Sequence, residues 1–288
     1  MEYIYCVITI TLFSTIEFTG KLIGSEVTPL GVTAWRFFIG ALIMLPFIKR
    51  KKLEIKDYIK MAWPGILNVA ISMYFLQLAV FHGKAFLAGT VVAMNPMFVT
   101  IISNFVLKEK ITFQKIAGIG FGITGLVLII TGEVNITNVN PSIYRGIFYS
   151  LMAALTFATY TVFSKKYVCE YGNIQFNFVS FLSGSIVLLS AGIVSGISIK
   201  VPTDLKILSL MAYNGIFVTG LAYILFFKAM EKLEASQASM FFFLKPVIVT
   251  FLSYKYLNEA ISTGQFTGII FAGISIVIVL LKKNKNSC

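Results

Sequence analysis

The chain has 288 residues, of which 57% are hydrophobic and only 12% are Asp, Glu, Lys or Arg, about half the charged fraction of a typical soluble protein. One water-facing core cannot bury so much apolar surface, so a soluble globular protein is excluded, and disorder is excluded because it needs low hydrophobicity. The net charge of +12 lies mostly in loops between hydrophobic segments, which indicates membrane topology and not nucleic-acid binding, and three scattered cysteines do not form a disulfide scaffold.

Ten mostly apolar segments have about the length of 20 residues that a membrane-spanning helix needs. In chain order they are 4–24, 29–49, 61–81, 85–107, 115–132, 145–165, 174–196, 207–229, 236–257 and 264–281. The first segment has no basic region before it and no cleavage site after it, so we expect a retained helix and not a signal peptide. The predicted fold class is an all-α membrane protein with ten transmembrane helices.

The distribution of lysine and arginine predicts the orientation. If the N-terminus is cytoplasmic, sixteen of the 24 basic residues lie on the cytoplasmic side and six outside, while Arg36 and Lys245 lie within spans. Basic residues are enriched in cytoplasmic loops. Both termini are therefore predicted to be cytoplasmic, in a multi-pass protein of the plasma membrane.

An internal repeat relates the two halves of the chain. At an offset of 150 residues, segment 85–118 matches segment 235–268, and the matching pairs include Pro96 with Pro246 and Glu109 with Glu259. The same offset also relates Gly65 to Gly215, outside these segments. Closer to the start of each half the match is weaker and the offset is 144, as for Phe13 and Phe157. The predicted domains are a five-helix repeat at 1–132, an external linker at 133–144 and a second repeat at 145–288 with a basic cytoplasmic tail.

Five helices make an odd number of crossings, so the second copy must enter the membrane inverted. Inverted repeats give two exchangeable conformations around one site near the membrane midplane, which is typical of secondary transporters that work by alternating access. No phosphate-binding loop signature is present that would indicate direct use of ATP.

The chain resembles the drug/metabolite transporter superfamily and, within it, the EamA family. The resemblance rests on the ten spans, the five-plus-five repeat, the Trp35-Arg36-Phe37 stretch, and the A-x-x-A, proline and glutamate pattern of spans 4 and 9. It implies spans 1 to 4 and 6 to 9 around a central cavity, spans 5 and 10 as buttresses, and export of small organic solutes that uses the proton gradient. The family usually has Trp-Gly in span 1, whereas this chain has Phe13-Ser14.

Glu17 is the only acidic residue within any predicted span. A buried carboxyl group at this depth needs a partner or a water-filled cavity, and burial favours its protonated form. Glu17 is therefore a candidate proton carrier, with a structural ion pair to Arg36 as the alternative. Arg36 keeps its charge, so it either anchors a carboxylate or holds Glu17 ionised.

Asn95 and Lys245 occupy equivalent positions before the prolines of spans 4 and 9. Pro96 and Pro246 displace the carbonyl groups of Val92 and Phe242, and these carbonyls could provide polar backbone atoms to a cavity. Alternatively, the two prolines only kink the helices for packing. Burial of the Lys245 ammonium at this depth in the membrane costs free energy, so Lys245 either pairs with Glu17 or binds an anionic group of the substrate.

Tyr74, Tyr160 and Tyr223 lie deep in spans 3, 6 and 8 and are further candidates to line the cavity. Small-residue faces, formed by Gly118 and Gly122 and by Gly264, Gly268 and Ala272, are candidate contacts for helix packing and a homodimer.

The resulting hypothesis is a proton-coupled exporter of small organic metabolites, such as amino acids or related amphiphilic compounds, with the lipid bilayer as its other partner. An exporter of cationic drugs is the main alternative, followed by an importer or a channel of the same fold. An intramembrane enzyme needs a metal cluster or an activated nucleophile, and one histidine with three scattered cysteines indicates neither. No enzyme activity, metal or cofactor is predicted.

Overall fold

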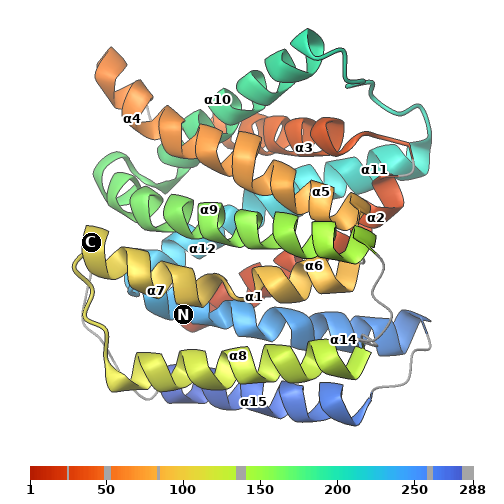
Figure 1. Ribbon diagram of the computed structural model, residues 1–288. Helices are drawn as coiled ribbons and strands as arrows, with labels where there is room; N and C mark the ends of the chain where they lie inside the picture. The colour runs from red at the N-terminus through yellow and green to blue at the C-terminus, as the bar shows by residue number, and fades with distance from the viewer. Residues whose placement is uncertain (25, 49–52, 83–84, 134–140, 258–261, 281–288) are drawn as a thin grey trace.

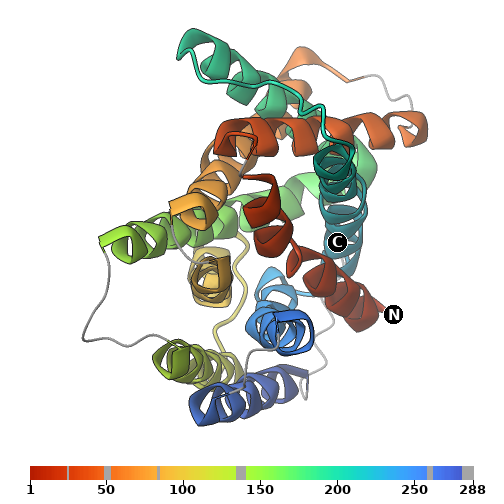
Figure 2. The same cartoon turned by 90° about the vertical axis from the view of Figure 1, so that its right-hand side faces the viewer.

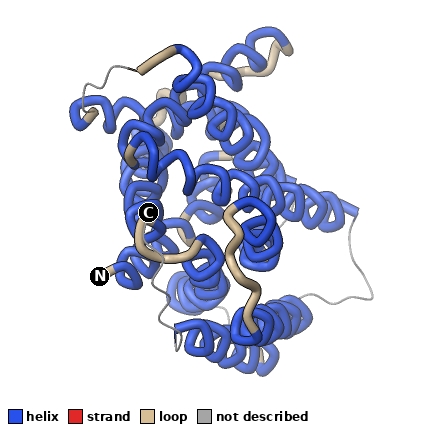
Figure 3. Tube along the Cα trace, turned by 90° about the vertical axis from the view of Figure 1, so that its left-hand side faces the viewer, coloured by secondary structure: helices blue, strands red, loops and turns tan. Residues whose placement is uncertain are grey.

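The computed structural model describes residues 1–24, 26–48, 53–82, 85–133, 141–257 and 262–280, and these ranges contain helices, turns and loops but no strand (Figures 1 and 3). Eight described helical segments are long and apolar enough to cross a membrane, and two further apolar helices, Ala235–Phe251 and Thr263–Ile278, are shorter. The predicted all-α membrane fold is confirmed, while ten spans and cytoplasmic termini stay predictions. Most of the linker predicted at 133–144 and the basic tail lie outside the described residues.

The first half of the chain contains helices of very different length. They are α1 (Glu2–Phe13), α2 (Ile16–Ile23), α3 (Pro29–Met44), the 3-10 turn η1 (Leu45–Phe47), α4 (Ile55–Ile66), the π-helix η2 (Leu67–Met73), α5 (Tyr74–His82), α6 (Ala85–Val92), α7 (Asn95–Val106) and α8 (Phe113–Glu133).

The second half has a similar sequence of elements. They are α9 (Pro141–Tyr171), α10 (Asn173–Val194), α11 (Leu205–Tyr213), the π-helix η4 (Asn214–Leu221), α12 (Ala222–Met230), α13 (Ala235–Met240), the 3-10 turn η5 (Phe241–Phe243), α14 (Leu244–Leu257) and α15 (Thr263–Leu280).

Irregular helix segments recur at equivalent places in the two halves. The π-helices η2 and η4 overlap at the 150-residue offset, and the break between α6 and α7 corresponds to the 3-10 turn before α14. Pro96 and Pro246 follow these breaks, because a proline lacks the backbone donor and collides with the carbonyl four residues earlier. The two prolines therefore lie at equivalent interruptions of spans 4 and 9.

The first span is also broken, but its counterpart in the second half is not. The helix is interrupted at Ser14 and Thr15, whose hydroxyls donate to the carbonyl oxygens of Ile10 and Leu12, each at 2.7 Å. Such local hydroxyl bonds compete with helical backbone bonds. At the matching position α9 runs without interruption from Pro141 to Tyr171.

Glycines bring helices of opposite halves into close contact. A Cβ atom at Gly65 of α4 would lie 2.1 Å from the carbonyl oxygen of Ser180, and one at Gly184 of α10 would lie 2.6 Å from the carbonyl oxygen of Gly65. In the symmetric contact of α3 with η4, a Cβ at Gly40 would lie 2.8 Å from Thr219 Cγ2. Span 2 therefore packs on span 8, and span 7 packs on span 3.

Helices α8 and α15 pack against each other at one edge of the bundle (Figures 1 and 2). A Cβ at Gly125 would lie 2.7 Å from the carbonyl oxygen of Gly268, and the Ser275 hydroxyl donates to the carbonyl oxygen of Gly118 at 2.6 Å. The small-residue faces considered for a homodimer are therefore occupied within one chain.

Candidate functional site

Glu17 lies in the first turn of α2, directly after the break in span 1. Its side chain is 2% exposed, and it faces Gly89 of α6, where a Cβ would lie 3.4 Å from the carboxyl carbon. The positive end of the helix dipole at the start of α2 favours a carboxylate. The break at Ser14 and Thr15 therefore creates a local environment for this charge inside the bundle.

Lys245 lies in the first turn of α14, after η5, and is also 2% exposed. Its Nζ donates to Oε1 of Glu17 in a buried ion pair, while Oε2 of Glu17 has no hydrogen-bond partner among the described residues. Because a helix start disfavours a cation, the carboxylate compensates Lys245. Of the two predicted alternatives for Lys245, the structure shows the pair with Glu17.

Arg36 of α3 is 3% exposed and forms no ion pair with Glu17 in the described part of the chain. Its Nε and Nη1 atoms have no hydrogen-bond partner there, and its guanidinium carbon lies 4.6 Å from the centre of the Phe37 ring. The predicted ion pair of Glu17 with Arg36 is therefore corrected, because Lys245 takes the carboxylate.

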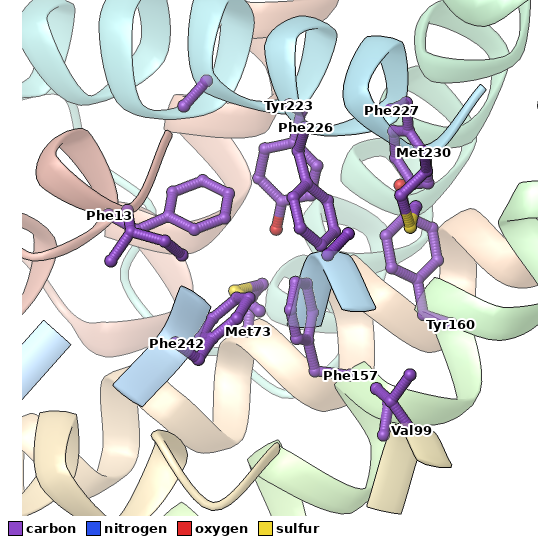
Figure 4. Packing of buried hydrophobic residues seen from close by; sticks show 14 of the residues in the cluster. Phe13, Met73, Val99, Phe157, Tyr160, Tyr223, Phe226, Phe227, Met230 and Phe242 are labelled. Carbon is purple, nitrogen blue, oxygen red and sulfur yellow. The ribbon is translucent and has the colours of Figure 1, made fainter. Parts of the chain in front are cut away.

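A small cavity lies where the broken helices meet. Its lining is apolar and aromatic except for Tyr223 and Lys245, and the remaining lining residues are Phe13, Ile16, Met73, Leu76, Val92, Phe157 and Phe242. Figure 4 shows the aromatic side chains of this group, which come from α1, α9, α12 and η5. Helices α8 and α15 supply none of these lining residues, in agreement with the buttress position that the family resemblance implies.

Three further predicted site residues, Tyr160, Tyr74 and Asn95, are not among the residues that line this cavity. Tyr160 is buried and its hydroxyl donates to Asn177 Oδ1 at 3.5 Å, while Tyr74 is half-buried. Asn95 donates to the carbonyl oxygen of Ala154 in α9 at 3.2 Å. Lys245 and Tyr223 thus line the cavity, and Glu17 is connected to it through its ion pair with Lys245. Arg36 lies beside Phe37, and the hydrogen bonds of Asn95 and Tyr160 go to other partners.

A second buried charge cluster lies at the end of the bundle that the sequence assigns to the cytoplasm. Lys115 Nζ is 2.7 Å from Glu234 Oε2, and Lys165 Nζ is 3.6 Å from Glu109 Oε1. Glu109 also accepts hydrogen bonds from the backbone N–H of Ala235 at 2.6 Å and of the next residue at 3.1 Å, so it caps α13.

Burial raises the pKa of Glu109, but the charge of Lys165, the hydrogen bonds at the start of α13 and the charge of Lys115 outweigh it, and the net pKa is lowered. In the sequence, Lys115 and Lys165 are interpretable only as markers of topology. The signal that was available is the recurrence of Glu109 in the repeated motif, which indicates a structural role beyond topology.

The central site offers proton and ion-pair chemistry. It combines one carboxyl group that can gain a proton, one ammonium that can exchange partners, and one guanidinium that keeps its charge. Within the described ranges, no group of three or more His, Cys, Asp or Glu side chains is placed to hold a metal ion. The arrangement presents charged groups next to the cavity.

Comparison with known proteins identifies the family. The sequence pattern of the EamA-like transporter family matches residues 1–131 and 144–281. An "Uncharacterized transporter" of Clostridium kluyveri is 35% identical over 285 residues, which cover 96% of this chain and 92% of the relative. The "Uncharacterized transporter YoaV" of Bacillus subtilis is 32% identical over 275 residues, with 91% of each chain covered.

The fold is also found in a solved structure. A protein crystal structure with 17% sequence identity superimposes with a TM-score of 0.80 and covers 97% of this chain and 96% of its own. Together with the apolar helices, these similarities indicate a multi-pass protein of the plasma membrane. The chain belongs to the EamA-like transporter family.

Proposed function

We propose that this transporter is a proton-coupled exporter of small organic metabolites, such as amino acids or related amphiphilic compounds. It works by alternating access of two inverted five-helix repeats, with ten spans and both termini in the cytoplasm. The observation that carries the proposal is the buried Glu17 and Lys245 ion pair at a cavity where several helices break. In transporters, broken helices at mid-membrane mark the sites of substrate and coupling ion.

The ion pair gives a route for proton coupling. A proton on Glu17 removes its charge and releases Lys245, so protonation changes both partners at once. Oε2 of Glu17 has no partner within the described residues and is the atom that takes the proton. Solute and proton then compete for Glu17 when the solute carries an ammonium group. Competition for one site couples inward proton flow to outward solute flow, because each carrier cycle exchanges one for the other.

The charge cluster of Glu109, Lys115, Lys165 and Glu234 is the second element of the proposal. It joins the loop after α7, the start of α8 and the end of α9 to the start of α13, so elements of both repeats meet there. We assign it the role of a cytoplasmic gate, whose ion pairs separate when the cavity opens inward.

Proton flux in proteoliposomes tests the function. Purified wild type, Glu17→Gln and Glu26→Gln are reconstituted with an internal pH dye, and amino acids and cationic drugs are added in turn. Glu26 is exposed, so its substitution is the matched control for the same chemical change. We expect at least one solute to drive proton flux in the wild type and the control but not in Glu17→Gln. Undiminished flux in folded Glu17→Gln would refute the coupling role.

An exporter of cationic drugs is the second candidate. The observation that favours it is the aromatic lining of the cavity, with Phe13, Phe157, Tyr223 and Phe242 available to bind an organic cation through their ring faces. In the same proteoliposomes, flux driven only by cationic compounds would select this candidate over amino acid-like solutes.

A further inference from the structure

The buried centre of the bundle carries more positive than negative charge. Arg36 and Lys245 are both buried, and Lys245 already pairs with the carboxylate of Glu17. Arg36 keeps its charge at all physiological pH values. A buried cation without a counter-ion is costly, and no ion pair joins Arg36 to a carboxylate among the described residues.

Two of the three guanidinium nitrogen atoms of Arg36 also lack a hydrogen-bond partner in the described part of the chain. Its Nε and Nη1 atoms are buried and have no partner among the described residues, although the adjacent Phe37 ring supports the guanidinium at 4.6 Å. Hydrogen bonds from a guanidinium to a carboxylate are charge-assisted and therefore strong. Nε and Nη1 lie on different edges of the group, so each offers one separate hydrogen bond to an acidic ligand.

Tyr223 brings a neutral polar group to the cavity wall. Its ring contacts Phe37 with 5.8 Å between the ring centres, and the Arg36 guanidinium lies 4.6 Å from the centre of the same Phe37 ring. Asn68 of η2 donates to the Tyr223 hydroxyl at 3.4 Å, and its own Oδ1 has no partner in the described part of the chain. The hydroxyl can therefore turn its proton toward a ligand.

We propose that Arg36, Tyr223 and Asn68 form an anion subsite of the cavity that binds the acidic group of the transported solute, with a carboxylate as the preferred class. This inference rests on the proposed transport function and adds the recognition of one substrate group. Arg36 supplies the fixed charge, Tyr223 donates from the cavity wall, and Asn68 orients the hydroxyl. The apolar lining residues, such as Phe157 and Phe242, contact the hydrophobic body of the solute.

Three probes with the same body and different charge test the subsite. Phenylacetate, phenylacetamide and phenethylammonium are titrated into the purified full chain, and their dissociation constants are measured from the shift in thermal unfolding. We expect phenylacetate to bind about tenfold or more tightly than the amide, the ratio expected for a charge-assisted hydrogen bond. Equal binding of acid and amide, tighter binding of the cation, or no binding of any probe overturns the subsite.

Substitution of Arg36 separates a binding role from a structural one. Arg36→Gln should abolish the preference for phenylacetate and leave the probe-free unfolding temperature unchanged or raised, because an uncompensated buried charge is removed. Arg36→Lys should keep part of the preference, since the charge remains. Arg145→Gln, at an exposed arginine of α9, is the control and should change neither property.

A lowered unfolding temperature of Arg36→Gln, with the phenylacetate preference retained, would identify Arg36 as a structural residue and refute the subsite. The failure of the proposed function is recognised separately. If Arg36→Gln loses the preference while Glu17→Gln keeps normal proton flux, the subsite stands and the coupling role of Glu17 falls. If the preference survives in Arg36→Gln while Glu17→Gln abolishes flux, the coupling role of Glu17 stands and the subsite falls.

Discussion

Glycine contacts are alike in the two halves of the chain, whereas the buried charges differ. Gly40 of α3 packs on η4, and Gly184 of α10 packs on Gly65, so the contact of span 2 with span 8 is repeated by span 7 with span 3. The matched pairs follow the offsets of 144 and 150 residues that the sequence repeat shows. This packing gives two equivalent interfaces along which helices of opposite halves meet.

Each buried charge of the central site has an uncharged counterpart in the other half. At the same offsets, Thr161 corresponds to Glu17 and Ser180 to Arg36, and Asn95 corresponds to Lys245. The counterparts bond to backbone: the Ser180 hydroxyl donates to the carbonyl oxygen of Met61 at 2.8 Å, and Asn95 donates to the backbone of α9.

Shared packing and unshared charges correspond to two different requirements of a carrier that works by alternating access. Symmetric contacts allow either half to adopt either conformation, whereas one solute needs one site and not two. The acid is supplied by the first half and its lysine partner by the second, so the ion pair links the halves across the cavity. Variants that break either the shared packing or the unshared charges should therefore have different effects.

The largest effect is expected from breaking the ion pair. Lys245→Gln should lower the free energy of unfolding by about 3–5 kcal/mol at neutral pH, because Glu17 loses its buried counter-ion. Glu17→Gln should have a loss of similar size, while the double variant should be more stable than either single one. Thermal unfolding of the three variants in detergent measures this coupling. Additive losses would show that the two side chains do not stabilise each other.

The charge cluster at the end of the bundle should give a smaller, pH-dependent effect. The lowered pKa of Glu109 means that its carboxylate stabilises the fold above the ordinary carboxyl pKa of about 4.3, and that this stability is lost as the pH falls through the lower pKa of the folded state. Glu109→Gln should cost about 1.5–3 kcal/mol near neutral pH, the range for a hydrogen bond to a charged group.

Unfolding temperature measured from neutral to acidic pH checks this expectation. The acid-induced loss should be smaller in Glu109→Gln than in the wild type. Glu54→Gln is the control, because Glu54 pairs with Lys56 at an exposed position with both side chains more than two-thirds accessible. If acid lowered the unfolding temperature of Glu109→Gln as much as that of the wild type, the stabilising role assigned to the Glu109 carboxylate would be wrong.

Much of the architecture could be predicted from the sequence, because apolar length and the 150-residue repeat are local or regular signals. Glu17 and Lys245 were also found, since charges within apolar segments are conspicuous. Their pairing was left open because it depends on which faces of two helices meet, and these residues are 228 positions apart. The alternative pairing of Glu17 with Arg36 was predicted from the depth of the two residues in the membrane. Depth alone does not specify which face of its helix a residue occupies.

Other features had weaker sequence signals. The prolines in spans 4 and 9 indicate the breaks of these helices. The break at Ser14 and Thr15 depends on hydroxyl groups that many regular helices also contain, so it has no such signal. The π-helices η2 and η4 follow from tertiary packing and carry no distinctive pattern of their own. The cluster around Glu109 was missed because basic residues at helix ends are more simply explained by membrane topology.

The shared packing should be more sensitive at Gly65 than at its counterpart Gly215. A Cβ at Gly65 would lie 2.1 Å from the backbone of Ser180, whereas the nearest atom to one at Gly215 is the side-chain Cγ2 of Ile39, at 2.5 Å. Gly65→Ala should therefore destabilise the protein by about 1–3 kcal/mol, and Gly215→Ala by less. Unfolding temperatures measure both, with Gly120→Ala as the control because a Cβ there meets nothing within 4 Å. Equal losses would refute this difference.

The smallest effect is expected at Asn95, the uncharged counterpart of Lys245. Asn95→Ala removes the hydrogen bond to the Ala154 carbonyl and should cost about 0.5–1.5 kcal/mol. Solute-driven proton flux in proteoliposomes should be unchanged, because Asn95 bonds to α9 and is not among the residues that line the cavity. Lost flux in a folded Asn95→Ala variant would contradict the division between the halves, since an uncharged counterpart would then take part in coupling. Retained flux beside a transport-defective Lys245→Gln would mean that equivalent positions of the repeat carry different functions.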